Sequence, residues 1–260
     1  MRRLVMSVAL AIFLVAGLLA LGHHYTWWGP EPPNDPNALV LRVRFVKGMA
    51  SPTDRPVPDI SVYGDGRTIT TGFDLTTSPA REVVKDQRLT HMAYRRLYRD
   101  ARLAGLGSSR TFSSHEQIID GGRTDITLLT EGKARLSKMP AGAGGVRVWL
   151  IDRMLKRLRS LPAGDLVRPP VTYHPERLAL VSFPASEPDP KTPTAPWPLA
   201  PLPVNTGATC TMLNGPDVDK ALQLAQTTSP TPYWRSGKTL YTVTFRPLLP
   251  DEHDCTAVTP

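Results

Sequence analysis

The chain has 260 residues, 31 basic against 23 acidic side chains, a formal net charge of +8 and two cysteines. This length allows one large domain or two modest ones. The cysteines do not form a Cys-x-x-Cys pair and no His-x-x-x-His pair is present, so the spacing excludes the common structural zinc sites.

Residues 1–28 have the pattern of an export signal or a membrane anchor. Two arginines precede an apolar stretch, Leu4 to Leu21, whose length lies between that of a signal-peptide core and that of a spanning helix. Small residues before His23 favour cleavage by signal peptidase, whereas Trp27 and Trp28 are typical of a membrane boundary. We therefore expect either a single-pass anchor with a cytoplasmic N-terminus or a secreted protein. In both cases the rest of the chain is extracytoplasmic.

A proline-rich spacer, residues 29–37, is expected to lead into a domain that covers residues 38–183. Residues 38–45 alternate apolar and arginine side chains, which predicts a half-buried strand. In residues 60–70 two apolar runs flank an Asp-Gly pair, which predicts a β-hairpin with a type I′ turn.

Two amphipathic helices are expected before and after a second hairpin in residues 123–139. Apolar residues recur at three- and four-residue spacing in residues 87–106 and 146–161, which is the period of a helix with one buried face. In the second helix we expect Trp149 and Leu158 on the buried side. The predicted fold class is α+β, with antiparallel β-hairpins packed against two amphipathic helices.

Four stretches follow one another in this part of the chain: VYGDGRTI, LYRDARLAGL, TDITLLTEGK and WLIDRMLKRLRSL. In this order the chain resembles an uncharacterised family of exported bacterial domains, whose hallmark is an aromatic-GDG hairpin, a helix ending in Ala-Gly, a Thr-rich hairpin and a closing amphipathic helix. The end of the chain, FRPLLPDEHDC, resembles a wider group of exported proteins from high-GC Gram-positive bacteria. The resemblance implies the fold and an extracytoplasmic location, but no activity and no catalytic residue.

The C-terminal part is expected to be a small α/β subdomain, residues 204–260. A strand in residues 177–184 precedes it, and residues 184–203 contain eight prolines, which predicts an extended linker. Within the subdomain we expect a helix with Asp217 as its N-cap.

Cys210 and Cys255 are the only cysteines. An even number of cysteines in an exported chain predicts a disulfide. The C-terminal subdomain is too small to be securely stable alone. A disulfide that closes a loop of this length is expected to stabilise it by about 4 kcal/mol.

Three motifs with possible chemical roles are better explained as structure. The glycines of residues 64–66 precede a strand rather than a helix, so they do not form a phosphate-binding loop. The AGAGG stretch, residues 141–145, precedes a helix but lacks a nucleotide-binding fingerprint. In DEHDC, residues 251–255, neighbouring side chains point to alternate faces and do not converge on one ion. We therefore expect no metal ligand, no cofactor and no catalytic residue.

Two functional alternatives to a non-catalytic envelope protein stay open. The first is an envelope hydrolase with an unrecognised site near Asp120, Asp125 and His115, because catalytic groups are assembled in space and not in sequence. The second is a scaffold that binds a protein partner through the proline-rich segment, with Trp197 as the anchor.

The basic residues concentrate in the middle of the chain, because residues 81–160 contain 17 basic and 8 acidic side chains. A non-catalytic envelope protein that binds anionic lipid or an anionic cell-wall polymer is the favoured function. Its location argues against nucleic acid as a partner. The candidate binding residues on the two predicted helices are Arg95, Arg96, Arg99, Arg102, Arg153, Lys156, Arg157 and Arg159.

Overall fold

A computed structural model of the protein describes residues 30–48, 56–74, 81–114, 118, 120–185, 189–227 and 232–258, together with Val15 and Gly17. The predicted signal or anchor, residues 1–28, lies outside the described residues apart from Val15 and Gly17. In the part of the chain that is described, no helix combines the length and the apolar character needed to span a bilayer.

The chain forms two compact units. Unit 1 comprises Met1–Val46 and Asp59–Thr172, and unit 2 comprises Lys47–Pro58 and Tyr173–Pro260. The units therefore part earlier in the chain than the proline-rich stretch, residues 184–203.

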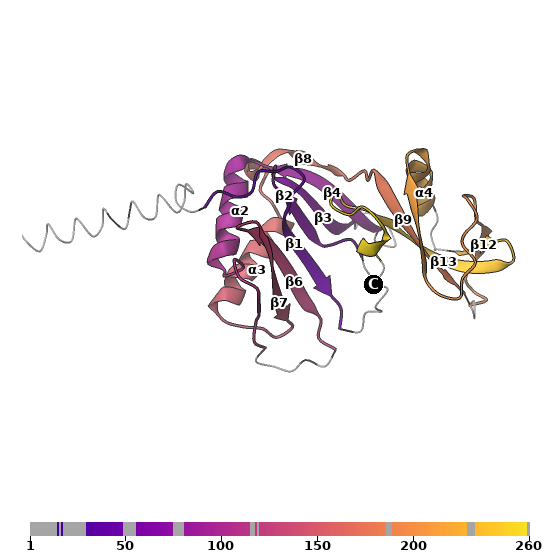
Figure 1. The fold of residues 1–260 in the computed structure, drawn as a ribbon, viewed down its shortest axis with the longest axis horizontal. Helices are drawn as coiled ribbons and strands as arrows, with labels where there is room; N and C mark the ends of the chain where they lie inside the picture. Colours follow the sequence, from indigo (N-terminus) through magenta and orange to yellow (C-terminus); the bar gives the residue numbers. More distant parts are fainter. Residues whose placement is uncertain are drawn as a thin grey trace, which may run out of the picture. The chain divides into compact units, whose positions relative to one another are not determined.

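Unit 1 contains one sheet of eight strands, in the order β5-β7-β6-β1-β2-β3-β4-β8 (Figure 1). Neighbouring strands are antiparallel, except that the short edge strand β5 runs parallel to β7. The strands are β1 (Leu39–Val46), β2 (Ile60–Tyr63), β3 (Arg67–Asp74), β4 (Arg81–Leu89), β5 (Arg110–Thr111), β6 (Arg123–Thr130), β7 (Lys133–Pro140) and β8 (Leu166–Thr172). The helices are α2 (His91–Leu103), α3 (Val146–Arg159) and the short 3-10 turn η1 (Ala163–Asp165).

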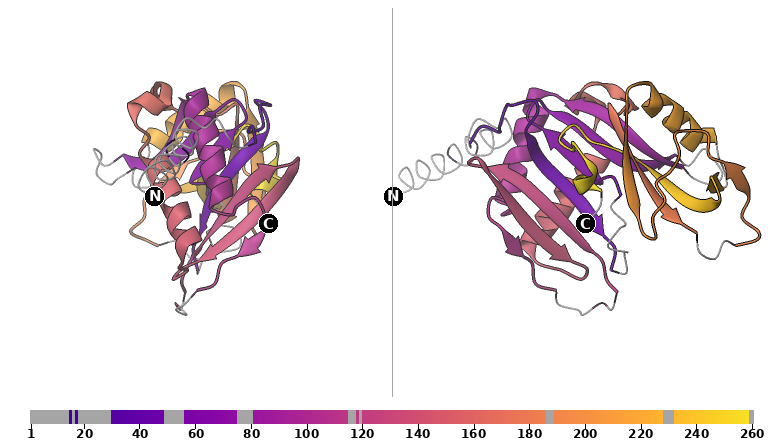
Figure 2. Two further views of the ribbon diagram at one scale, coloured as in Figure 1. Left: turned by 90° about the vertical axis from the view of Figure 1, so that its left-hand side faces the viewer. Right: turned by 45° about the vertical axis from the view of Figure 1, so that its right-hand side comes forward.

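The core of unit 1 lies between the sheet and its two long helices. Figures 1 and 2 show α2 and α3 side by side over one face of the sheet. Leu41 of β1, Val62 of β2 and Leu128 of β6 belong to one buried cluster with Tyr94 and Tyr98 of α2. This arrangement confirms the predicted α+β class, because alternating apolar residues of the hairpins and one face of each helix exclude water together.

The first hairpin is present, but its turn differs from the predicted type I′. Within residues 64–66 only Gly66 has a positive φ, of 79°, and its amide donates to the carbonyl of Tyr63 at 2.9 Å. This geometry is a type I turn followed by a left-handed glycine, the usual form of a three-residue hairpin loop. The type I′ signature occurs in the second hairpin instead, where Glu131 and Gly132 have φ values of 53° and 70°.

The first helix is shorter than predicted and begins at His91. The hydroxyl of Thr90 accepts a hydrogen bond from the amide of Ala93 at 3.3 Å, so Thr90 is the N-cap. Arg88 and Leu89, which we expected within the helix, are the last residues of β4. The apolar spacing continued into the strand because the last apolar residue of β4, Leu89, enters the same core as the helix.

The second helix, α3, begins where the sequence predicts, but its buried face is rotated. The buried residues of α3 are Val148, Ile151, Met154, Leu155 and Leu158. Trp149 was expected on the buried side, yet it is 57% exposed. Spacings of three and four residues connect Val148, Ile151, Leu155 and Leu158, so this smaller aliphatic set defines the face that packs.

Unit 2 contains a second sheet, in the order β10-β12-β13-β9-β11. Its elements are β9 (Arg177–Pro184), β10 (Thr194–Pro196), β11 (Thr209–Asn214), α4 (Pro216–Thr227), β12 (Tyr233–Ser236), β13 (Thr239–Pro247) and η2 (Cys255–Ala257). The right-hand view of Figure 2 shows α4 alongside this sheet. Because α4 begins at Pro216, Asp217 lies inside the first turn and is not the predicted N-cap.

The described residues of the proline-rich segment, 184–185 and 189–203, pack within unit 2. Strand β10 pairs in parallel with β12, and Trp197 is only 9% exposed. The Trp197 ring meets Trp234 edge to face, with the ring centroids 5.4 Å apart, and its indole N–H donates to the carbonyl of Ala200 at 2.8 Å. Trp197 is therefore a core residue of unit 2 and not an exposed anchor for a partner.

Candidate functional site

The four candidate arginines of α2 are half buried and contact partners within unit 1. Each of these ion pairs or hydrogen bonds uses guanidinium donors that an external anion would otherwise receive. The partners are Glu31 for Arg95 at 2.6 Å, Asp165 for Arg96 at 2.9 Å, Asp100 for Arg99 at 3.3 Å, and both Thr130 and Glu131 for Arg102 at 2.7 and 3.7 Å.

Asp165 connects three elements of unit 1. Its carboxylate accepts from Arg96 of α2 at 2.9 Å and from Arg157 of α3 at 2.7 Å, while its carbonyl accepts from the amide of Thr90 at 2.8 Å. These side chains line a small hollow. The volume open to the centre of a water molecule there is about 20 Å³, so it has room for about one water. These contacts therefore hold the helices together, and the hollow is too small for a larger ligand.

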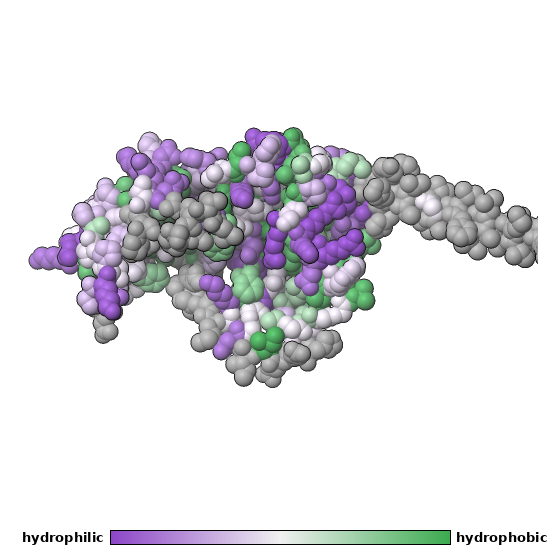
Figure 3. Space-filling model, turned by 180° about the vertical axis from the view of Figure 1, so that it is seen from behind, coloured by the Kyte–Doolittle hydropathy of each residue, from purple (hydrophilic) through white to green (hydrophobic). Residues whose placement is uncertain are grey.

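The outward face of α3 is the least engaged basic surface on the two helices. We use this name for Val146, Trp149, Arg153, Lys156 and Arg159, all of which are exposed. The Arg153 guanidinium lies over the Trp149 ring, 5.6 Å from its centroid. Among the described residues no carboxylate forms an ion pair with Arg153, Lys156 or Arg159. Figure 3 shows a broad hydrophilic area on the side of unit 1 where the helices lie.

Two exposed residues of α3 were absent from the predicted site. Arg147 precedes the predicted basic cluster, and Trp149 was assigned to the core. The regular spacing of Val148, Ile151 and Leu155 could have placed Trp149 on the other side of the helix. Successive residues of an α-helix are rotated by about 100°, so Trp149 points away from the face that these three aliphatic residues share. An exposed tryptophan beside basic side chains is typical of a surface that contacts a polar–apolar boundary.

Residues 31–38, which include most of the predicted spacer (residues 29–37), are attached to unit 1. The hydroxyl of Tyr94 donates to the carbonyl of Pro33 at 2.6 Å, and Arg95 pairs with Glu31 at 2.6 Å. A Cβ on Gly64 would collide with the backbone carbonyl of Asp35, so only glycine fits at this hairpin position. The described part of the predicted spacer is therefore docked beside α2 and does not extend freely from the domain.

We expect Tyr94→Phe to lower the free energy of unfolding by about 1 kcal/mol, because the partly buried carbonyl of Pro33 loses its donor. Burial, and then the nearby Tyr98 and Asp65, raise the pKa of Tyr94 above its ordinary value. Above about pH 10 an unfolded tyrosine loses its proton while folded Tyr94 keeps it, so the stability that Tyr94 contributes falls as the pH rises.

Urea unfolding of both proteins at a series of pH values measures this effect. The wild type should lose stability more steeply above about pH 10 than the Tyr94→Phe variant. Equal slopes for the two proteins would show that Tyr94 is not held in its neutral form.

The hydrolase candidates are not brought together in the described residues. Asp125 forms an ion pair with Arg123 at 2.8 Å within β6, and Asp120 lies in the preceding turn with φ of 57°. His115 lies outside the described residues. Among the described residues no hydrogen bond or ion pair joins Asp120 to Asp125, whereas a hydrolytic site requires a nucleophile in contact with a base.

The acidic cluster near the C-terminus divides among structural contacts. Glu252 is buried against Arg246, the His253 ring lies 2.9 Å from an Arg177 nitrogen, and Asp254 accepts from the amide of Thr256 at 2.9 Å. Hydrogen bonds from the hydroxyl and then the amide of Thr256 hold the pKa of Asp254 below its ordinary value. Within the described ranges no group of three potential ligands could hold a metal ion.

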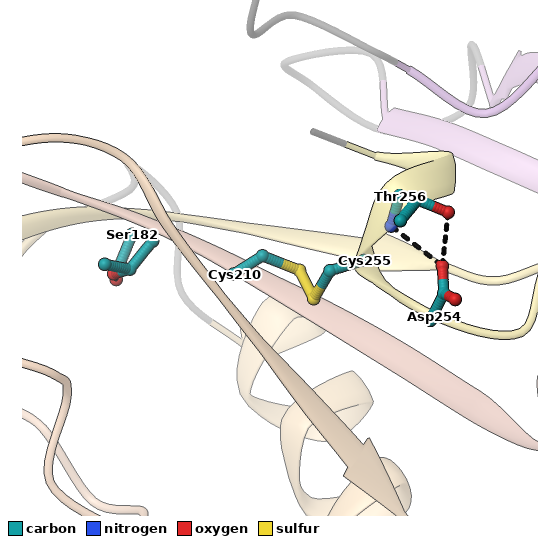
Figure 4. The surroundings of a disulfide bond; sticks show 6 residues. Ser182, Cys210, Asp254, Cys255 and Thr256 are labelled. Atoms are coloured by element: carbon teal, nitrogen blue, oxygen red, sulfur yellow. Dashed lines mark hydrogen bonds between the residues drawn. A yellow bond between two sulfur atoms is a disulfide. The ribbon is translucent and has the colours of Figure 1, made fainter. Parts of the chain in front are cut away.

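The predicted disulfide is present in unit 2. Figure 4 shows Cys210 of β11 joined to Cys255 of η2, beside the hydrogen-bonded Asp254 and Thr256. The bond connects positions 45 residues apart, so it attaches the C-terminal turn to an edge strand of the second sheet.

Comparison with known proteins adds no functional assignment: no family model matches the chain, and neither a curated protein nor a solved structure shows significant similarity to it.

Proposed function

We propose that the protein is a non-catalytic extracytoplasmic protein that contacts an anionic membrane surface through the outward face of α3. The observation that carries this proposal is the exposed Trp149 with Arg153 above its ring, on the same exposed face of α3 as Lys156 and Arg159. Basic residues near an anionic bilayer each contribute about 1 kcal/mol to binding, and tryptophan prefers the headgroup region. Both residue types therefore favour the same surface.

The attachment of residues 31–38 supports a membrane rather than a distant partner. If the apolar stretch is an uncleaved anchor, Leu21 is its last residue in the membrane, and Pro30 follows nine residues later. At most about 30 Å of extended chain separates them. Glu31 and Pro33 contact α2, and α3 packs beside α2, so the outward face of α3 would lie within reach of the bilayer.

Two further observations support an extracytoplasmic location. The Cys210–Cys255 disulfide is of a kind that persists in oxidising compartments. The hairpin and helix motifs resemble those of exported bacterial domains. Neither observation points to a catalytic site.

The proposal is tested with the full chain reconstituted into nanodiscs of neutral lipid, with or without anionic lipid. Quenching of Trp149 by brominated lipid, taken as the difference between the wild type and Trp149→Phe, reports docking of α3. We expect docking only with anionic lipid, and we expect salt to weaken it. A double variant in which glutamine replaces both Arg153 and Lys156 should dock more weakly. The free energy of docking should become less favourable by about 2 kcal/mol, which lowers the docking constant roughly 30-fold.

The matched control replaces Arg235 and Lys238 of unit 2 with glutamine. Both are exposed, so the variant removes the same charge from a different surface and should dock like the wild type. Docking that does not depend on the charge of the lipid, or an equal loss of docking in the control variant, would contradict the proposal. Binding to a purified anionic wall polymer without quenching by lipid would replace the membrane with that polymer as the partner.

A further inference from the structure

Four arginines gather over the edge of the first sheet, on the face that the helices cover. We call Arg102, Arg110, Arg135 and Arg147 the arginine cluster. Arg135 of β7 lies opposite Leu128, a core residue of that face. Arg110 of β5 lies opposite Ser137, two residues further along β7. Paired positions share a face of the sheet and so do positions two apart, so Arg110 and Arg135 are diagonal neighbours.

The helices contribute the other two members of the arginine cluster. Arg102, near the end of α2, donates to the hydroxyl of Thr130 at 2.7 Å. Arg147 is the second residue of α3. A Cβ on Gly105 would lie 3.3 Å both from the guanidinium carbon of Arg110 and from the Cδ of Arg147, so these two side chains flank the same glycine.

The cluster has few internal acceptors for its charge. The hydroxyls of Ser108 and Thr130 accept from Arg110 and Arg102, but neither hydroxyl carries a negative charge. In the described part of unit 1 the one carboxylate in an ion pair with it is Glu131, 3.7 Å from Arg102 and itself 73% exposed. The Nε atoms of Arg110 and Arg135 are shielded from solvent and have no hydrogen-bond partner among the described residues. Gathering guanidinium charges and withdrawing their donors from water costs free energy unless an acceptor is supplied.

We infer that the arginine cluster is a binding site for a phosphate group. Guanidinium groups present paired N–H donors that match the oxygens of phosphate, and such charge-assisted bonds are stronger than neutral ones. A bound phosphate would supply acceptors to the shielded Nε atoms and would neutralise part of the positive charge. The site is separate from the outward face of α3 and does not depend on the function proposed above.

The test uses the full chain in a phosphate-free maltoside detergent, with inorganic phosphate as the first probe and glycerophosphoglycerol as the second. Isothermal titration should show saturable binding of at least one probe, whereas chloride at equal ionic strength should not compete. Arg110→Gln and Arg135→Gln should each weaken binding by roughly tenfold or more, the scale of one lost charge-assisted bond. Arg147→Gln changes an exposed residue, so it tests the site without disturbing the buried side chains.

Two comparisons separate the possible results. Preference for the diester would identify a lipid headgroup or polymer phosphate as the source, and preference for inorganic phosphate would identify a free phosphate or a monoester. The Arg153→Gln, Lys156→Gln double variant should bind both probes like the wild type, even if it no longer docks on membranes. Absence of binding to either probe, or equal binding by the wild type and the Arg147→Gln and Arg110→Gln variants, would overturn the inference.

Discussion

Replacing Glu252 with glutamine is expected to lower the free energy of unfolding of unit 2 by roughly 3–5 kcal/mol. The side chains of Arg246 and Glu252 are each only 3% exposed, and they form an ion pair at 2.6 Å with a second bond at 2.9 Å. Glu252 also accepts from the amide of Leu249 at 2.9 Å. Glutamine has nearly the same shape but no charge, so the buried Arg246 guanidinium loses the negative charge of the carboxylate that pairs with it.

Urea unfolding followed by tryptophan fluorescence measures this loss, because Trp197 and Trp234 lie in the core of unit 2. The matched control is Glu176→Gln, which makes the same chemical change at an exposed position of the same unit and should alter stability by no more than about 0.5 kcal/mol. Replacing Arg246 with methionine together with Glu252 with leucine should recover part of the loss, because no buried charge is then left alone. Equal effects of Glu252→Gln and Glu176→Gln would show that the ion pair does not stabilise unit 2.

Removing the disulfide is expected to cost about 4 kcal/mol, the second large effect on unit 2. The bond closes a loop between positions 45 residues apart, and in the chain-entropy model a cross-link stabilises by restricting the unfolded chain. Cys210→Ala with Cys255→Ala removes it and avoids leaving free thiols. Both cysteines are partly buried, so alanine also removes a small amount of packing.

Denaturant unfolding with and without a reductant provides the measurement. The reductant should lower the unfolding midpoint of the wild type toward that of the double alanine variant, and it should leave the variant unchanged. A wild-type midpoint that does not respond to complete reduction, verified by thiol titration, would contradict the entropic contribution of this bond.

Elements defined by local periodicity were predicted closely from the sequence. Strand β9 has the predicted bounds, residues 177–184, because a short apolar run between turn residues favours a buried strand in any fold. Helix α3 begins at the predicted residue for a similar reason, since Gly145 precedes a regular apolar repeat. The Cys210–Cys255 pairing followed from the presence of only two cysteines.

The candidate site was predicted less completely, because its geometry depends on residues far apart in the chain. Arg96 meets Asp165 across 69 residues, and Tyr94 meets Pro33 across 61. The arginines of α2 therefore contact partners that helical periodicity does not reveal. The reverse holds for Trp149, which hydrophobicity assigns to the core although the smaller side chains of α3 fill that space.

The sequence by itself determined the fold class, most of the strands and helices, the disulfide and the concentration of basic charge in unit 1. These depend on local backbone preference, on the period of apolar residues and on composition. Only the tertiary structure decided which basic side chains are engaged internally, that Trp197 is buried while Trp149 is exposed, and that Arg110 and Arg147 meet beside Gly105. The physical reason is that burial and pairing arise between surfaces, and which surfaces meet depends on the packing of the whole unit.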